Sequence, residues 1–386
     1  MGISNANKQA VCEKYRTYVE IIYRFGNKVM LMKQLYQYAE LLGIASNFSS
    51  FYNSIMELVH AEVIRKEPFV AFGKRTQLQT LSLRKYAIRF IEQKPDSNSV
   101  ASLPKTNGNE RILLSIFKNC YIINKVIPRV KREMGETSFA NIIKMLKRDH
   151  STILFSKNQG IPFLSELRND KKLQPILNIE GIDQCLGRMR EIKKKHLDGF
   201  QRGSSMSEGK GRGNTRSSSH SPLADLEDLV DVRVAKDPTK EEKIDYYTID
   251  TMLSFNAYIA QIKIKDGKVN VTVLIFDIHN KQNIYRTVTH IACIYNMLNR
   301  FFNSEFLLRI GIVSIDEFAS KNLKAQAESK PIDFNSKERK GKRQSIILRE
   351  WRVDEEMQMQ IDVQFVDYDI TNQFLDGIKH ANLIRR

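Results

Sequence analysis

The chain has 386 residues and a formal net charge of +17, and this length predicts two or three domains with sizeable cores. No apolar run approaches the roughly 20 residues that cross a membrane. The four cysteines are too scattered for a zinc site or a disulfide framework. With no apolar secretory signal at the start, we expect a cytoplasmic protein that does not enter a membrane.

The positive charge is concentrated in the first half of the chain. The first 202 residues carry +16 of the net charge, whereas residues 203–244 and 245–386 are each close to neutral. This distribution predicts an N-terminal half that binds a polyanion and a C-terminal half with another role.

Residues 10–95 form the first predicted domain. Apolar spacing predicts helices over 13–24, 30–42 and 48–61, strands over 63–69 and 77–83, and a closing helix over 84–91. A basic turn that contains Lys74 and Arg75 separates the two strands.

This order of elements resembles the winged helix-turn-helix of MarR-like or PadR-like regulators. The resemblance implies that the helix over 48–61 reads DNA and that Lys74 and Arg75 lie at the wing tip. Its DNA-facing positions would be Asn47, Ser49, Ser50, Asn53 and Ser54. That helix carries no Lys or Arg on its outer face, so neighbouring cations would have to contact the phosphates. The alternative is a protein-docking or dimerisation module.

Residues 108–200 form the second predicted domain, which we expect to be all-helical. A helix is predicted over 110–126, with an interruption at Pro128, and two short helices over 138–158. Asp149 is expected to N-cap the second of these short helices. His150, Ser151 and Thr152 would then face outward, where a helix-turn-helix places its base-reading residues.

The string RDHST at 148–152 resembles the helix-turn-helix signature of DnaA-type replication initiators. The resemblance implies that Arg148 contacts the backbone or the minor groove and that Asp149, His150, Ser151 and Thr152 face major-groove bases. It covers only this hairpin, and no phosphate-binding loop occurs in the chain, so nucleotide-driven assembly is not implied. The alternative is a helical hairpin with a solvated polar turn.

A further helix is predicted over 184–196, and it is strongly basic. Lys193, Lys194 and Lys195 end this run, which can follow a phosphate backbone or form a solvated face. Residues 201–244 are rich in Gly and Ser with few apolar residues, and we expect a disordered linker there.

Residues 245–386 are expected to form an α+β domain with a mixed sheet. The elements predicted there are a hairpin of strands over 258–265 and 268–276, strands over 306–314, 345–353 and 357–367, and helices over 287–302, 317–327 and 371–383. Self-association or the binding of a partner protein or small effector is the expected role.

The fold class expected is therefore a multidomain protein with an N-terminal winged helix-turn-helix, an all-α helix-turn-helix domain, a disordered linker and a C-terminal α+β domain. The predicted function is sequence-specific binding of double-stranded DNA, as a homo-oligomer, in replication, partition or transcription control of a bacterial plasmid or phage. We expect no cofactor and no enzymatic activity. The alternatives are a protein-binding adaptor and a metal-dependent nuclease or relaxase that uses Asp277, Asp316 and Asp367.

Overall fold

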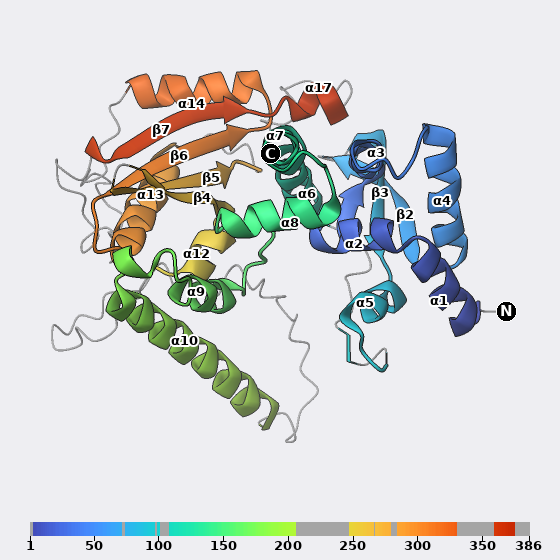
Figure 1. Ribbon diagram of the computed structural model, residues 1–386, viewed down its shortest axis with the longest axis horizontal. Coiled ribbons are helices and arrows are strands. Elements are labelled where there is room, and N and C mark those ends of the chain that lie inside the picture. The colour runs from blue at the N-terminus through green and yellow to red at the C-terminus, as the bar shows by residue number, and fades with distance from the viewer. Residues whose placement is uncertain are drawn as a thin grey trace, which may run out of the picture.

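The computed structural model describes residues 3–71, 74–96, 99–100, 108–205, 247–265, 267–278, 284–329 and 359–374, which form an α+β structure with two sheets. One sheet is antiparallel with three strands, and the other is mixed with four strands. Figure 1 shows them on opposite sides of the molecule, with helices between them. The predicted α+β layout and the mixed C-terminal sheet agree with this arrangement. The linker is predicted over 201–244, but residues 201–205 are helical, and the rest of it lies outside the described residues.

The first sheet and five helices form the N-terminal unit. Its elements are α1 (Asn5–Lys14), α2 (Arg16–Arg24), β1 (Val29–Leu31), α3 (Met32–Leu41), α4 (Phe48–His60), β2 (Ile64–Ala71), β3 (Lys74–Leu83) and α5 (Lys85–Glu92). The strands lie in the order β1-β3-β2, and Ala71 pairs with Lys74 at the tip of the hairpin. The predicted helix over 13–24 is in fact two helices that meet at Tyr15. Only Cys12 of α1 is buried, so no apolar repeat marks α1 in the sequence.

The predicted interruption at Pro128 is wrong. Helix α6 (Asn109–Tyr121) continues through the π-helical turn η1 (Ile122–Val126) into α7 (Ile127–Met134). Pro128 lies inside this continuous helical run, directly after the π-helical turn, and the wider turn makes room for a proline that a regular α-helix would not accommodate. The wider turn before it bonds the Ile127 N–H to the Ile122 carbonyl.

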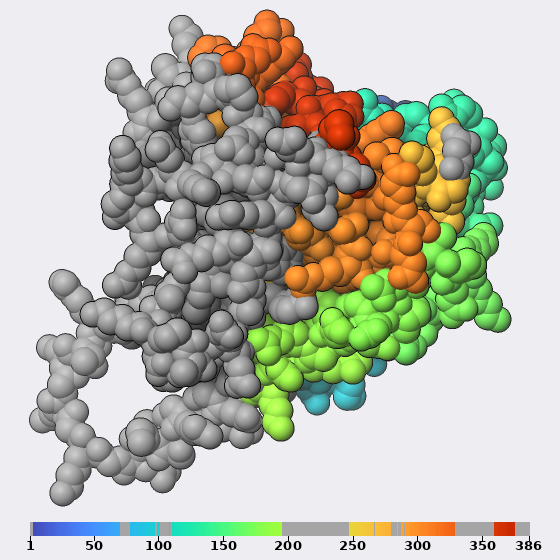
Figure 2. Space-filling model, turned by 90° about the vertical axis from the view of Figure 1, so that its left-hand side faces the viewer, coloured from blue at the N-terminus to red at the C-terminus, as the bar shows by residue number. Residues whose placement is uncertain are grey.

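Helices α8 (Phe139–Arg148), α9 (Gly160–Arg168) and α10 (Ile179–Ser205), with the short η2 (Gln174–Ile176), complete the helical part. The main-chain N–H of Asn178 donates to the Phe301 carbonyl at 2.9 Å, and Leu177 bridges to Phe302. Figure 2 shows the green residues of α9 and α10 lying directly against the orange residues of the C-terminal half. The helical part and the second sheet therefore share one packed body.

The second sheet consists of β4 (Ala257–Lys265), β5 (Lys268–Phe276), β6 (Phe306–Ser314) and β7 (Ile361–Asp367). The helices of this part of the chain are α12 (Ile249–Ser254), α13 (Ile284–Asn299), α14 (Glu317–Ser329) and α17 (Ile370–Phe374). Its order is β4-β5-β6-β7, with β4 antiparallel to β5 and the other neighbours parallel. The predicted hairpin and the strand over 306–314 are confirmed. The strand predicted over 345–353 lies outside the described residues, as does most of the last helix.

Helix α6 joins the two halves of the molecule. Its Ser115 hydroxyl donates to the Val29 carbonyl at 2.7 Å, and the buried Tyr38 hydroxyl of α3 donates to Asn119 at 2.8 Å. On its other side, the ring of Phe117 packs 5.4 Å from that of Phe276 in β5. The N-terminal unit and the second sheet thus pack on the same helix.

Candidate nucleic-acid interface

Helix α4 presents the polar residues that the sequence assigns to DNA contact. Asn47 caps the helix, because its side-chain oxygen accepts the Ser50 N–H at 2.8 Å. Asn47, Ser50 and Asn53 are exposed, and Ser54 is half-buried with its hydroxyl donating to the Ser50 carbonyl at 3.1 Å. The opposite side of α4 is buried, and its members are Phe51, Ile55 and Leu58. Asn53 is therefore the residue of this group whose polar side chain is least engaged in capping the helix.

Two cations beside α4 are engaged by side chains of that helix. Glu57 of α4 pairs with Lys14 of α1 at 2.8 Å. Lys66 of β2 donates to the Tyr52 hydroxyl at 3.1 Å and lies 4.9 Å from that ring's centroid. The register of the hairpin places Lys74 near its tip, while the side chains of Lys74 and Arg75 lie outside the described residues.

An apolar patch adjoins the N-terminus of α4. Leu41, Ile44 and Phe48 have relative exposures of 43%, 37% and 46%. They are three of the six large hydrophobic side chains that are exposed in the described parts of the chain. The turn between α3 and α4 therefore offers an apolar contact surface beside the polar one.

The expected second helix of the RDHST hairpin is absent. Helix α8 ends at Arg148, and residues 149–159 have no regular secondary structure. His150 adopts a left-handed conformation with φ +51°, which breaks the helix immediately after Asp149. The predicted helix-turn-helix geometry is therefore wrong for this segment, so Asp149 does not N-cap a recognition helix.

The side chains of residues 149–152 are mostly buried against β4. The main-chain N–H of Thr152 donates to the Ile259 carbonyl at 2.8 Å, and the Ile259 N–H donates to the Thr152 hydroxyl at 2.8 Å. Ser151 contacts the same carbonyl through its hydroxyl at 3.2 Å, and the Ile262 N–H donates to the Asp149 carbonyl at 2.9 Å. An edge strand exposes unpaired main-chain groups, and here the polar string covers those of β4.

Asp149 is the centre of a buried ion pair. Its carboxylate accepts two hydrogen bonds from the Arg129 guanidinium, at 2.8 and 3.2 Å, and one from the Gln261 amide at 2.7 Å. Arg148 forms an ion pair with Glu133, and the His150 Nε2 lies 3.5 Å from the Asp170 carboxylate oxygen Oδ2. Burial lowers the pKa of His150 in spite of the neighbouring carboxylates, which favours its neutral form. Base reading by residues 148–152 remains a prediction, and the burial of Thr152 argues against it.

The basic end of α10 is partly described. Lys193 and Lys194 are exposed, whereas the side chain of Lys195 lies outside the described residues. Figure 1 shows α10 projecting away from the second sheet. Lys193 and Lys194 are therefore placed where a phosphate backbone can reach them.

Asp277, Asp316 and Asp367 are the acids of the enzymatic alternative. They lie at the carboxyl ends of β5, β6 and β7, and these ends are on the same side of the second sheet because the three strands are parallel neighbours. Asp316 is engaged as a structural residue: it accepts the Ala319 N–H at 3.0 Å and the Thr371 hydroxyl at 2.7 Å. Asp277 is half-buried and Asp367 is exposed. In the described ranges, no group of three or more His, Cys, Asp or Glu side chains is arranged to hold a metal ion.

Comparison with protein families, with curated proteins and with solved structures finds no match for this chain. None of the described helices combines the length and the apolar character needed to span a bilayer.

Proposed function

We propose that the chain is a double-stranded DNA-binding protein and that α4 is the recognition helix of a winged-helix unit. The observation that carries the proposal is the order α3, α4, β2 and β3, with a polar face of α4 exposed beside a hairpin whose tip carries Lys74. A helix with that exposure can enter a major groove while the hairpin follows the adjacent backbone. Figure 1 shows α4 at the end of the molecule away from the second sheet, so a duplex can approach it.

The proposal assigns affinity and specificity to different residues. The +16 charge of the first 202 residues, including Lys193 and Lys194 of α10, supports phosphate contacts. Asn53 and its neighbours on α4 supply hydrogen bonds to base edges, for which Asn is suited at adenine. Residues 149–152 are not included, because they cover β4. The processes that fit are control of replication, partition or transcription.

The test is selection of bound fragments from a random duplex library by the full chain at physiological salt, followed by affinity measurements on the enriched site. We expect Asn53→Asp to weaken binding by about 1–3 kcal/mol, because it removes a base contact and places a carboxylate near phosphates. Asn124→Asp is the matched control, since Asn124 is exposed on η1. A library without enrichment refutes the proposal, and equal binding by the two variants moves base reading away from α4.

A second function is favoured by the apolar patch of Leu41, Ile44 and Phe48. Buried apolar area drives protein association, so we propose self-association through this patch as the competing role of the α3–α4 turn. Phe48→Ser should then lower the sedimentation coefficient, whereas Phe318→Ser, at a similarly exposed position on α14, should not. A monomeric wild-type chain refutes this second function.

A further inference from the structure

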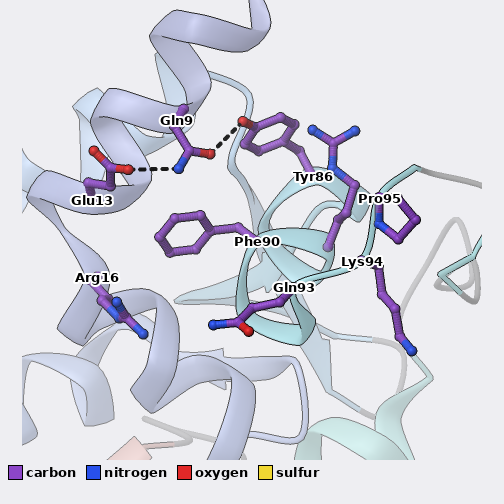
Figure 3. Close-up of a pocket in the computed structure, with 9 residues that line it drawn as sticks. Gln9, Glu13, Arg16, Tyr86, Phe90, Gln93, Lys94 and Pro95 are labelled. Carbon is purple, nitrogen blue, oxygen red and sulfur yellow. Dashed lines mark hydrogen bonds between the residues drawn. The ribbon is translucent and has the colours of Figure 1, made fainter.

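A surface cavity of about 390 Å³ lies between α1, α2 and α5, in the N-terminal unit but separate from the exposed polar face of α4. Figure 3 shows the side chains of Phe90, on α5, and of Gln93, directly after that helix, projecting into the space that α1 and Arg16 border. The volume is near the lower end of the range for small-molecule sites. The cavity is therefore large enough for a small metabolite but not for a large cofactor.

The lining of the cavity carries excess positive charge. Its charged lining residues are Arg16, Arg89 and Lys94 and a single carboxylate, that of Glu13. Glu13 accepts a hydrogen bond from Gln9 at 2.7 Å, and Arg16 donates through Nε to Glu20 at 2.8 Å. In the part of the chain that the structure describes, no carboxylate forms an ion pair with Arg89 or Lys94. An anion is the ligand that balances these charges.

Two aromatic rings form the half-buried wall of the same cavity. Tyr86 and Phe90 are four residues apart on α5, so they lie on one side of the helix. The Arg89 guanidinium lies 4.6 Å from the Tyr86 ring centroid, and the Arg16 guanidinium lies 5.8 Å from that of Phe90. The rings hold these cations in place, and they give a planar ligand group a surface on which to stack.

Hydrogen bonds hold this wall against α1. The Tyr86 hydroxyl lies 3.0 Å from the Gln9 side-chain oxygen and 3.1 Å from the Asn5 carbonyl (Figure 3). The amides of Gln9 and Gln93 are exposed at the rim, and either can donate to or accept from the edge of a ring. Because the wall is already fixed, a ligand orders few side chains when it binds.

We propose that this cavity binds a mononucleotide. Its phosphate contacts the Arg89 guanidinium, and its base packs against Phe90 within reach of the rim amides. A phosphate alone would leave the aromatic wall uncovered, and an uncharged ring would leave the cations unbalanced. The joint presence of both features therefore favours a ligand that combines an anion with a planar ring.

The experiment is isothermal titration of the full chain with AMP, adenosine and inorganic phosphate as separate probes. We expect AMP to bind at least about tenfold more tightly than either of the others. Arg89→Gln should weaken AMP binding about tenfold, which is about 1.4 kcal/mol, and Phe90→Leu should weaken it several-fold while keeping the apolar packing. Arg132→Gln, at an exposed arginine of α7, is the matched control and should bind AMP as the wild type does.

Three results overturn the proposal. AMP that fails to bind below about 10 mM shows that the cavity is not a ligand site. Equal affinity for AMP and inorganic phosphate shows that the rings take no part in binding. Unchanged AMP affinity in Arg89→Gln, with an unchanged melting temperature, places the binding elsewhere. None of these measurements uses DNA, so failure here leaves the proposed function of α4 unaffected.

Discussion

Lys118 tests whether water is excluded from the contact between α6 and β4. Its ammonium group is buried, donates to the Phe155 carbonyl at 2.9 Å and lies 4.1 Å from the ring centroid of Tyr258. None of the described carboxylates forms an ion pair with it. Burial lowers the pKa of Lys118 to about 7. We predict that Lys118→Met is more stable than the wild type at pH 6 and less stable near pH 10.5.

The sign follows from proton linkage. Below pH 7 Lys118 is charged in both the folded and the unfolded chain, so the cost of burying the charge is fully present. Between pH 7 and about 10.5 the folded state loses the proton while the unfolded state keeps it, and the free energy of unfolding of the wild type therefore rises with pH. Above that range Lys118 is neutral in both states and the cost is gone. The Met variant lacks this rise.

The magnitude follows from the size of the pKa shift. Lowering a lysine pKa from 10.5 to about 7 corresponds to about 5 kcal/mol, which is the net difference between burying the charged and the neutral form of the side chain. At high pH the Met variant should be less stable than the wild type by about 1 kcal/mol, the value of the hydrogen bond to Phe155. Because the free energy of unfolding of the wild type rises by about 5 kcal/mol between pH 6 and that range, the Met variant should be more stable than the wild type by about 4 kcal/mol at pH 6.

Urea unfolding followed by circular dichroism at pH 6, 8 and 10 measures the difference. Lys125→Met makes the same chemical change at an exposed lysine of η1, so its stability relative to the wild type should not depend on pH. A difference between Lys118→Met and the wild type that is constant with pH would show that Lys118 is hydrated, and the reasoning from burial would then be wrong.

Three other substitutions test the packing in different places. Gly181→Ala should destabilise the protein by about 1–3 kcal/mol, because the added Cβ would lie 2.1 Å from the Arg300 carbonyl oxygen. Gly187→Ala in the same helix places its Cβ where nothing lies within 4 Å, and it should stabilise the protein by about 0.5–1 kcal/mol. Equal shifts in the melting temperatures of the two variants would contradict this. Asp149→Ala should cost about 1–3 kcal/mol, because the partly buried Arg129 guanidinium loses its two hydrogen bonds to Asp149 and keeps only the 3.5 Å contact with Glu133. An unchanged urea midpoint would argue that the Arg129–Asp149 ion pair is solvated. Thr152→Val should cost about 1–3 kcal/mol and speed amide exchange at the edge of β4, while Thr152→Ser should retain the acceptor and the protection.

The elements that the sequence predicts best are those with strong local signals. The alternating strands around the Asp266-Gly267 turn identify β4 and β5 to within one residue, because Gly267 supplies the positive φ of +75° that the turn requires. Helix α4 is predicted equally well, since Asn47 caps it and its apolar residues repeat at helical spacing. In these segments the local preference and the final packing agree.

The RDHST segment shows what local patterns cannot decide. A polar string after a basic helix end is compatible with the start of a recognition helix, and the residues suit base contact by type. The partner that determines its structure is β4, more than a hundred residues later in the chain. Asp, Ser and Thr satisfy main-chain donors and acceptors of a strand edge as well as those of a helix end, and only the tertiary structure distinguishes the two.

The candidate sites are predictable only in part, for a similar reason. The exposed polar face of α4 follows from the helical period, but its pairing with a cation depends on α1, which has no apolar repeat in the sequence. The cavity next to α5 combines Tyr86 and Phe90 with Arg16 from α2, about seventy residues earlier. The basic and aromatic residue types are visible in the sequence, whereas their common location is not.

The two faces of α6 determine how the halves of the molecule are oriented. Toward the N-terminal unit the contacts are specific hydrogen bonds: the buried Asn119 bonds to Tyr38 and to the Phe25 carbonyl, and Gln34 donates to the Ile116 carbonyl. A rotation of α6 would leave these buried groups unsatisfied, which is costly at low dielectric. Toward the second sheet the contacts are aromatic, led by Phe117, and they hold the sheet by burial of area. Because one continuous helix carries both sets, a duplex bound at α4 would meet the rest of the protein in a fixed orientation, and the cations of α10 would act on it only in that geometry.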